Sequence, residues 1–98
     1  MEKLVRDKIP EIVSAARGER APFRIASRTE YLRLLGDKLK EEVAEFLERR
    51  EPGELADILE VVNQLGREVG LTPADLEKMR REKAAIRGGF DRRIVMDF

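Results

Sequence analysis

A chain of 98 residues has the length of one domain with a modest core, and a chain this short gains stability from a partner subunit. Its 20 lysine and arginine residues balance its 20 aspartate and glutamate residues, so it lacks the basic surface with which DNA- and RNA-binding proteins contact phosphates. It has no cysteine and no histidine, which excludes disulfides, zinc–thiolate sites, thiol nucleophiles and the commonest general base.

The N-terminal residues and the overall composition predict a location and a fold class. MEKLVRDKIP (1–10) lacks the apolar core of a signal peptide, and nowhere do about 18 apolar residues run together as a membrane span requires. We therefore expect a cytoplasmic protein with no membrane partner. Charged residues make up 41% of the chain and aromatic residues only 5%, which favours salt-bridged helices and predicts an all-α fold.

The first predicted helix follows the charged N-terminal segment. Asp7 is placed to cap this helix, and Pro10 is tolerated in its first turn. Gly18 stands where a helix commonly ends, directly after Arg17. A polar connector, residues 19–26, then separates this helix from the rest of the chain.

The second and third predicted helices form an antiparallel pair. Ser27-x-x-Glu30 has the spacing of a capping box and opens a long helix that ends near Arg50. The Pro-Gly dipeptide at 52–53 breaks the chain there, and the third helix continues to about Val69. Because the break is short, we expect the two helices to pack side by side in opposite directions.

The fourth predicted helix begins at the sequence Thr-Pro-Ala-Asp, residues 72–75, and ends near Arg87 before two glycines. The tail that follows contains the apolar run Ile-Val-Met at 94–96, which could add as a strand or lie across the helices. The whole chain, residues 1–98, is thus predicted to be a single domain, an antiparallel bundle of about four helices completed by oligomerisation.

Two pairs of carboxylates with matched spacing lie on either side of the Pro-Gly break, Glu42-x-x-Glu45 and Glu54-x-x-Asp57. At about 100° per residue, the apolar residues of each helix occupy an arc from about 20° to 140° away from its first carboxylate. The second carboxylate of each pair falls near 300°, at about the same border of that arc. If the two apolar arcs pack against each other, all four carboxylates lie at the border between core and solvent.

Carboxylates gathered at such a border have two interpretations. They repel one another, and a hard divalent cation such as Mg²⁺ would relieve the repulsion while keeping positions open for water and substrate phosphates. A solvated acidic helix face, paired with basic residues one turn away, explains the same spacing. The residues alone leave a metal–phosphate site and a solvated face both open.

The combined motifs resemble the MazG-like all-α nucleoside triphosphate pyrophosphohydrolases, a superfamily that also includes phosphoribosyl-ATP pyrophosphohydrolase and dimeric dUTPases. EEVAE (41–45) and ELAD (54–57) match its E-x-x-E helix and the E-x-x-D helix that follows. The ends KLVRDKIPEI (3–12) and RGGFDRRI (87–94) resemble a short phosphoribosyl-ATP pyrophosphohydrolase-like subgroup, so the similarity extends over nearly the whole chain.

This resemblance implies hydrolysis of a nucleoside triphosphate between its α and β phosphates, giving a nucleoside monophosphate and pyrophosphate in a house-cleaning role. It implies Mg²⁺, with Mn²⁺ as an alternative, and a homodimer or homotetramer. The implied metal ligands and catalytic residues are Glu42, Glu45, Glu54 and Asp57. Two alternatives stay open: phosphoribosyl-ATP as the substrate, in histidine biosynthesis, and a non-catalytic helical module that dimerises or binds a nucleotide.

Basic residues near these motifs are the predicted substrate ligands. Lys38, one turn before Glu42, could bind a phosphate oxygen or form an i,i+4 ion pair with that glutamate. Lys83 and Arg87 lie one turn apart and could bind phosphate next to the two glycines. The charged N-terminal segment, with Lys3 and Arg6, is expected to close over the nucleotide.

Three further side chains have weaker assignments. Tyr31 could stack on a base or belong to the core. Gln64 falls near 280° on the third helix, which places it on the acidic flank either as a site residue or as a solvated one. Phe90, after the two glycines, has the same two interpretations as the tyrosine.

Overall fold

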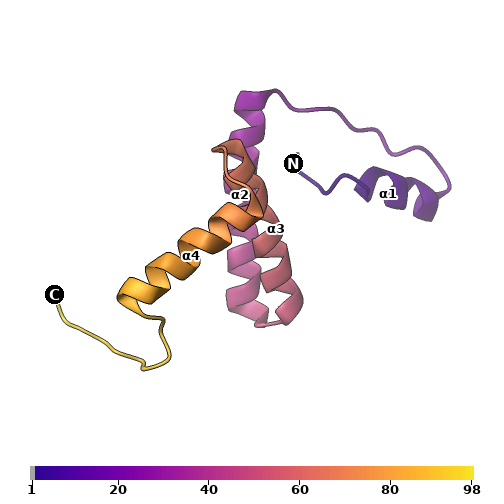
Figure 1. The fold of residues 1–98 in the computed structure, drawn as a ribbon. Helices are drawn as coiled ribbons and strands as arrows, with labels where there is room; N and C mark the ends of the chain where they lie inside the picture. The colour runs from indigo at the N-terminus through magenta and orange to yellow at the C-terminus, as the bar shows by residue number, and fades with distance from the viewer. Residues whose placement is uncertain (1) are drawn as a thin grey trace.

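The computed structural model describes residues 2–98 as four α-helices without a β-strand (Figure 1). The helices are α1 (Ile9–Arg17), α2 (Arg28–Arg49), α3 (Pro52–Glu68) and α4 (Pro73–Arg87). The all-α prediction is confirmed, and each helix begins and ends within a few residues of its predicted bounds. Within residues 2–98, none of the helices combines the length and the apolar character needed to cross a membrane.

The start of α4 carries a complete capping box, whereas the start of α2 carries half of one. Thr72 Oγ1 accepts the Asp75 backbone N–H at 3.1 Å, and Asp75 Oδ2 accepts the Thr72 N–H at 2.9 Å. Ser27 Oγ accepts the Glu30 N–H at 3.3 Å. The Glu30 carboxylate accepts two hydrogen bonds of 2.7 Å from Arg24 and does not return to the Ser27 backbone. A charge-assisted contact has therefore replaced the second capping bond.

The prediction that Asp7 caps the first helix is wrong. Lys8 occupies the N-cap position of α1 with helical backbone angles, φ −90° and ψ −4°, and no side chain caps this helix. Side-chain capping needs an extended N-cap residue whose oxygen reaches the next turn, and that conformation is absent here. The other end agrees with the sequence, since Gly18 stops α1 in the left-handed conformation with φ of +70°.

The antiparallel pair of α2 and α3 forms the centre of the molecule (Figure 1). Arg50 ends α2 with φ of 58°, and Pro52 begins α3. α4 packs against the end of α3, where a Cβ on Gly66 would lie 2.6 Å from Leu76 Cδ1, so a larger residue there would require the Leu76 side chain to move. Among residues 2–98, α1 packs against none of the other helices and lies to the side of the pair.

The contact between α2 and α3 passes through the carboxylates, and this corrects the predicted packing. The buried side chains at the contact are Leu35 and Glu42 on α2 and Glu54 and Val61 on α3, with Glu42 and Glu54 only 6% and 7% exposed. Packing of the two apolar arcs would have left the carboxylates at a solvent border. The helices are instead rotated about their axes, so that Glu42 and Glu54 face inward, while Glu45 and Asp57 stay half-buried at the border.

This rotation leaves the outer half of each apolar arc exposed. We define the apolar face as five residues that are between 38% and 58% exposed: Leu32, Val43, Leu47, Leu55 and Leu59. Around the axis of its helix, each of the five residues lies about 80° to 140° away from the side that contacts the other helix. In an antiparallel pair these directions point to the same side, so the five residues form one continuous face. The opposite side of the pair, which we call the polar side, carries Lys38, Asp57 and Gln64.

The chain is more open than a compact domain of its length. Its radius of gyration is 17.4 Å, whereas a compact domain of this size has about 13 Å. Its accessible surface of 8785 Å² exceeds by roughly 3,000 Å² the area expected for a folded monomer of this mass. The excess surface agrees with a chain whose helices require a partner for full burial.

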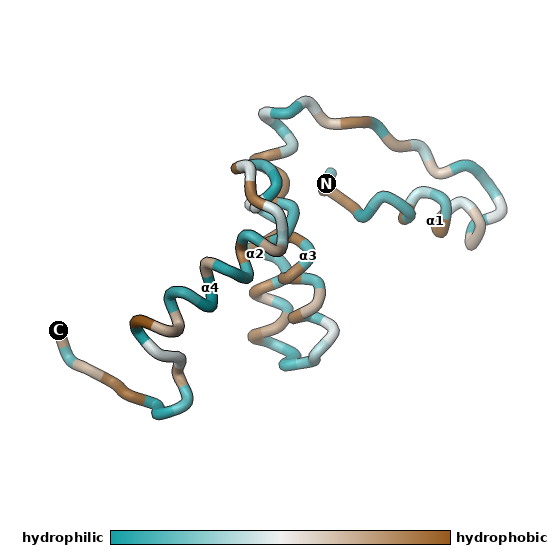
Figure 2. The backbone as a smooth tube through the Cα atoms, in the orientation of Figure 1, coloured by the Kyte–Doolittle hydropathy of each residue, from teal (hydrophilic) through white to brown (hydrophobic). Residues whose placement is uncertain are grey.

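The C-terminal tail neither adds as a strand nor lies across the helices. Val95 is 92% exposed, and Phe90 and Phe98 are almost fully exposed. Figure 2 shows apolar stretches in this tail and in the connector between α1 and α2, both away from the central pair. An extended apolar segment has no local cause to fold back, so its predicted docking would need a surface that one chain does not supply.

Candidate metal centre

Three of the four predicted carboxylates meet between α2 and α3. Glu42 from α2 and Glu54 and Asp57 from α3 each place one oxygen within 4.8 Å of the others. Glu42 and Glu54 are buried, and Asp57 is half-buried at the polar side. Oxygen ligands at about 2.1 Å from Mg²⁺ lie at most about 4.2 Å apart, so small side-chain rotations would convert this triad into ligand geometry.

Glu42 supplies the observation that distinguishes a binding site from a solvated acidic face. Its Oε1 forms an ion pair with Lys38 Nζ at 3.3 Å. Its Oε2 is buried and has no hydrogen-bond partner among residues 2–98. An unsatisfied buried oxygen costs about 1–3 kcal/mol, and more when the group is charged. Stability alone therefore gives no reason to place a carboxylate here, whereas a bound cation would satisfy the oxygen.

The two remaining glutamates of the motifs, Glu54 and Glu45, have different surroundings. Glu54 Oε1 lies 3.3 Å from Arg49 Nη1, a contact that sequence reasoning missed although a basic residue in the last turn of α2 was a signal for it. Glu45 is half-buried one turn beyond Glu42, and its carboxylate lies outside the triad. Its predicted role as a ligand stays a prediction.

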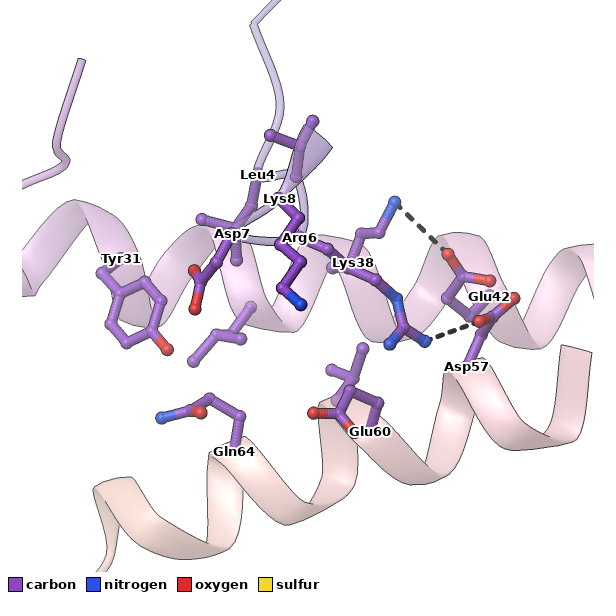
Figure 3. A pocket seen from close by; sticks show the side chains of 13 residues that line it. Leu4, Arg6, Asp7, Lys8, Tyr31, Lys38, Glu42, Asp57, Glu60 and Gln64 are labelled. Atoms are coloured by element: carbon purple, nitrogen blue, oxygen red, sulfur yellow. Dashed lines mark hydrogen bonds and ion pairs between the residues drawn. The ribbon is translucent and has the colours of Figure 1, made fainter. Parts of the chain in front are cut away.

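The N-terminal segment crosses the polar side, and its Arg6 side chain extends to Asp57 of the triad (Figure 3). Arg6 Nη2 lies 2.7 Å from Asp57 Oδ1. Lys3 Nζ lies 3.0 Å from Glu41 Oε1, and Lys38 Nζ lies 3.3 Å from the other oxygen of the same glutamate. The predicted basic residues of this segment therefore do reach the acidic cluster, where they neutralise part of its charge.

These contacts change two pKa values. The hydrogen bond from Lys3 is the largest effect on Glu41 and, with a second bond from Lys38, holds the pKa of that carboxyl below its usual range. For Lys38, burial is the largest single effect and lowers the pKa, but hydrogen bonds to Glu42 and Glu41 together outweigh it and raise the pKa. Both groups are thus charged at neutral pH, and Lys38 stays a cation at the rim of the triad.

Two adjoining cavities lie between the N-terminal segment and the central pair. The smaller, of about 250 Å³, is lined by Glu42, Asp57 and the basic residues beside them. The larger, of about 370 Å³, begins at the same residues and extends to Tyr31 and Gln64. Figure 3 shows the larger cavity with its acidic end on one side and Tyr31 and Gln64 on the other. Lys38 also lines both cavities.

Lys83 and Arg87, the predicted phosphate ligands on α4, are not brought to the triad. Both are exposed and line neither cavity. α4 contacts α3 at Gly66, and the 12 helical residues back to Glu54 span about 18 Å. Phe90 is 96% exposed and has no role at this site within one chain.

Comparison with protein-family models, with curated proteins and with solved structures finds no match for this chain. What the structure establishes is an all-α protein of four helices over residues 2–98, with an acidic triad that could hold a metal ion. Any assignment of function therefore depends on the motifs and on the geometry of the triad and its two cavities.

Proposed function

We propose that the protein is a Mg²⁺-dependent nucleotide pyrophosphohydrolase of the MazG-like kind, which hydrolyses a nucleoside triphosphate to a nucleoside monophosphate and pyrophosphate. The observation that carries the proposal is the buried, unsatisfied Oε2 of Glu42 inside a carboxylate triad. The triad is built from the E-x-x-E and E-x-x-D motifs on two consecutive helices, which is the arrangement that the resemblance implies.

The residues of the triad fit a hard divalent cation. All candidate ligand atoms are carboxylate oxygens, the donors preferred by Mg²⁺ and Mn²⁺, and the chain contains no histidine or cysteine that would favour softer metals. Three protein ligands would leave positions for water and phosphate oxygens. Glu45, one turn away, is the remaining carboxylate of the two motifs.

The side chains around the triad suit a polyphosphate. Arg6 and Lys38 place their cationic groups beside Asp57 and Glu42, in the smaller cavity, and would bind phosphate oxygens there. Attack by water on one phosphorus of the α–β anhydride forms a new P–O bond, breaks the bond to the bridging oxygen, and transfers a proton to a carboxylate. When bound, the metal would polarise phosphate oxygens and increase the acidity of the attacking water.

We propose that a second copy of the chain covers the apolar face. The excess surface of roughly 3,000 Å² per chain, or roughly 6,000 Å² for two chains, reaches the upper end of the total area that obligate homodimers bury. A homodimer is the simplest assembly, and a homotetramer would use further surface such as the apolar tail. Lys83 and Arg87 could contribute to a triad only from such a neighbouring copy, because within one chain they lie far from it.

Two other functions predict different results. Phosphoribosyl-ATP as the substrate keeps the reaction and the site, so only a substrate assay separates the two. A non-catalytic helical module is favoured by the exposed apolar face but gives no reason for the buried Glu42 oxygen. Such a module would show the same thermal stability with and without Mg²⁺, whereas a metal that binds only the folded state raises stability by mass action.

The direct test is release of pyrophosphate from a panel of nucleoside triphosphates and from phosphoribosyl-ATP, with and without Mg²⁺. Glu42→Gln and Asp57→Asn should each reduce kcat/KM on the order of a hundredfold or more, because each removes a charged oxygen ligand of the proposed metal ion. Glu48→Gln is the matched control, since Glu48 is an exposed glutamate of α2 outside the triad. Equal rates in all four proteins would rule out the proposed site.

A further inference from the structure

The larger cavity continues past the triad to an end that the proposed hydrolysis does not use. Tyr31 of α2 and Gln64 of α3 face this end from opposite helices (Figure 3), and the apolar residues Leu35 and Val61 also line the cavity. Both polar residues are half-buried. A cavity of about 370 Å³ falls within the size range of small-molecule sites, which is about 300–1,000 Å³.

The separation between the two ends matches the length of a nucleotide. The seven residues from Asp57 to Gln64 rise about 10 Å along α3. The eleven residues from Tyr31 to Glu42 rise about 16 Å along α2. A nucleotide whose phosphates lie at the triad would extend its sugar through the middle of the cavity and place its base between Tyr31 and Gln64.

The side chains at this end are suited to a base. The Tyr31 ring offers an aromatic surface for stacking, and its hydroxyl stays neutral because burial, together with the charges of Glu68 and Asp7, raises its pKa. The Gln64 amide can both accept and donate hydrogen bonds. Its Oε1 accepts only a long contact of 3.4 Å from the exposed Arg67, a bond that a ligand would readily replace.

Acceptor oxygens outnumber cations at this end. Asp7 and Gln64 contribute carboxylate and amide oxygens on the side of Tyr31, while Glu60 and Lys8 line the wall between this end and Asp57 (Figure 3). Carboxylates accept hydrogen bonds but cannot donate them when ionised. A base with an exocyclic amino group offers donors to these oxygens, whereas a base with a carbonyl in that place would set one acceptor against another.

We propose that the Tyr31–Gln64 end of the cavity is a nucleobase subsite that selects bases with an exocyclic amino group, such as adenine and cytosine. The proposal rests on the proposed function, which sets the direction of the nucleotide by placing its phosphates at the triad. Tyr31 stacks on the base, and Gln64 reads its edge through paired hydrogen bonds.

The test compares two pairs of substrates that differ by an amino group against a carbonyl, ATP with inosine triphosphate and CTP with UTP. In each pair the amino member should have the higher kcat/KM, on the order of tenfold, the discrimination of one paired amide contact. Gln64→Leu should abolish that ratio, whereas Asn63→Ala, at a neighbouring amide that does not line the cavity, should preserve it. Equal ratios in wild-type protein and Gln64→Leu, or a preference for the carbonyl member, would overturn the proposal.

A binding experiment separates failure of this subsite from failure of the proposed function. Tyr31 is the single tyrosine of the chain, so the ring signals of tyrosine-labelled protein in an NMR spectrum report on this end alone. Adenosine monophosphate, which has no anhydride bond, should shift these signals more than inosine monophosphate, in wild-type protein and in Glu42→Gln alike. That result without any pyrophosphate release would support the subsite and refute the hydrolysis. Pyrophosphate release with unmoved Tyr31 signals would do the reverse.

Discussion

The two sides of the α2–α3 pair differ in what covers them. On the polar side, the N-terminal segment crosses the pair and places Arg6 on Asp57, enclosing two cavities above the triad. On the opposite side, the apolar face stays open, with Leu47 and Leu59 56% and 58% exposed. The same two amphipathic helices thus have one side covered by their own chain and one side without a cover.

The difference shows that each side lacks a different component. Each carboxylate of the triad has a cation beside it, from Lys38, Arg49 or Arg6, but one oxygen of Glu42 has no partner within residues 2–98. A bound metal ion would supply that partner, because a buried oxygen without a hydrogen bond is costly. The apolar face exposes hydrocarbon to water, so it requires another apolar surface.

The largest effect is expected at the apolar face. Leu59→Asp should dissociate the proposed homo-oligomer, because burial of one leucine contributes about 1.5–3 kcal/mol and a two-fold interface loses that contribution twice, besides the cost of burying two carboxylates. Sedimentation or light scattering at several concentrations would measure the mass of the assembly.

Ile86→Asp is the matched control for this substitution. Ile86 is 85% exposed on α4 and lies outside the apolar face, so its replacement should leave the assembly intact. A monomeric wild-type protein, or equal masses for both variants, would contradict the assignment of this face as the interface.

A smaller effect of opposite sign is expected at the triad. Without metal, Glu42→Gln should raise the free energy of unfolding by about 1 kcal/mol, because it removes a buried charge with an unsatisfied oxygen while an amide oxygen can still accept from Lys38. The same variant should lose most of the Mg²⁺-dependent rise in melting temperature. Calorimetry with and without Mg²⁺ measures both changes, with Glu48→Gln as the control. A less stable variant in the absence of metal would mean that Glu42 stabilises the fold directly.

The smallest effect is expected at the edge between the segment and the triad. Arg6→Ala removes a cation that competes with the metal for Asp57, so the Kd for Mg²⁺ should fall. The expected decrease is about two- to fivefold, because an ion pair between half-exposed side chains contributes little free energy. Titration calorimetry would measure the change, and Arg20→Ala, in the exposed connector, serves as its control. Weaker Mg²⁺ binding would show that Arg6 supports the site instead of competing for it.

Local features of the fold were predictable from the sequence. The capping residues Thr72 and Asp75, the helix break at Pro52, and the glycine that stops α1 all lie where their short-range chemistry places them. Asp7 failed as a cap because the Lys8 backbone is helical, a detail that spacing does not reveal.

The sequence predicted more of the carboxylates that form the candidate site than of the residues that line the cavity around them. The sequence predicted from spacing that Glu42, Glu45, Glu54 and Asp57 gather at one place, and three of them meet in the structure, without Glu45. It did not identify Tyr31 and Gln64 as opposite walls of one cavity, because their approach depends on how two helices are rotated against each other.

The sequence by itself thus determined where each helix begins and ends and which residues share a helix face, because both depend on neighbours within a turn or two of the chain. Only the tertiary structure decided that Glu42 and Glu54 turn inward, that the apolar face stays open, and that Lys3 and Arg6 return to Glu41 and Asp57. These features depend on contacts between segments far apart in the chain, and several packings satisfy the same amphipathic pattern.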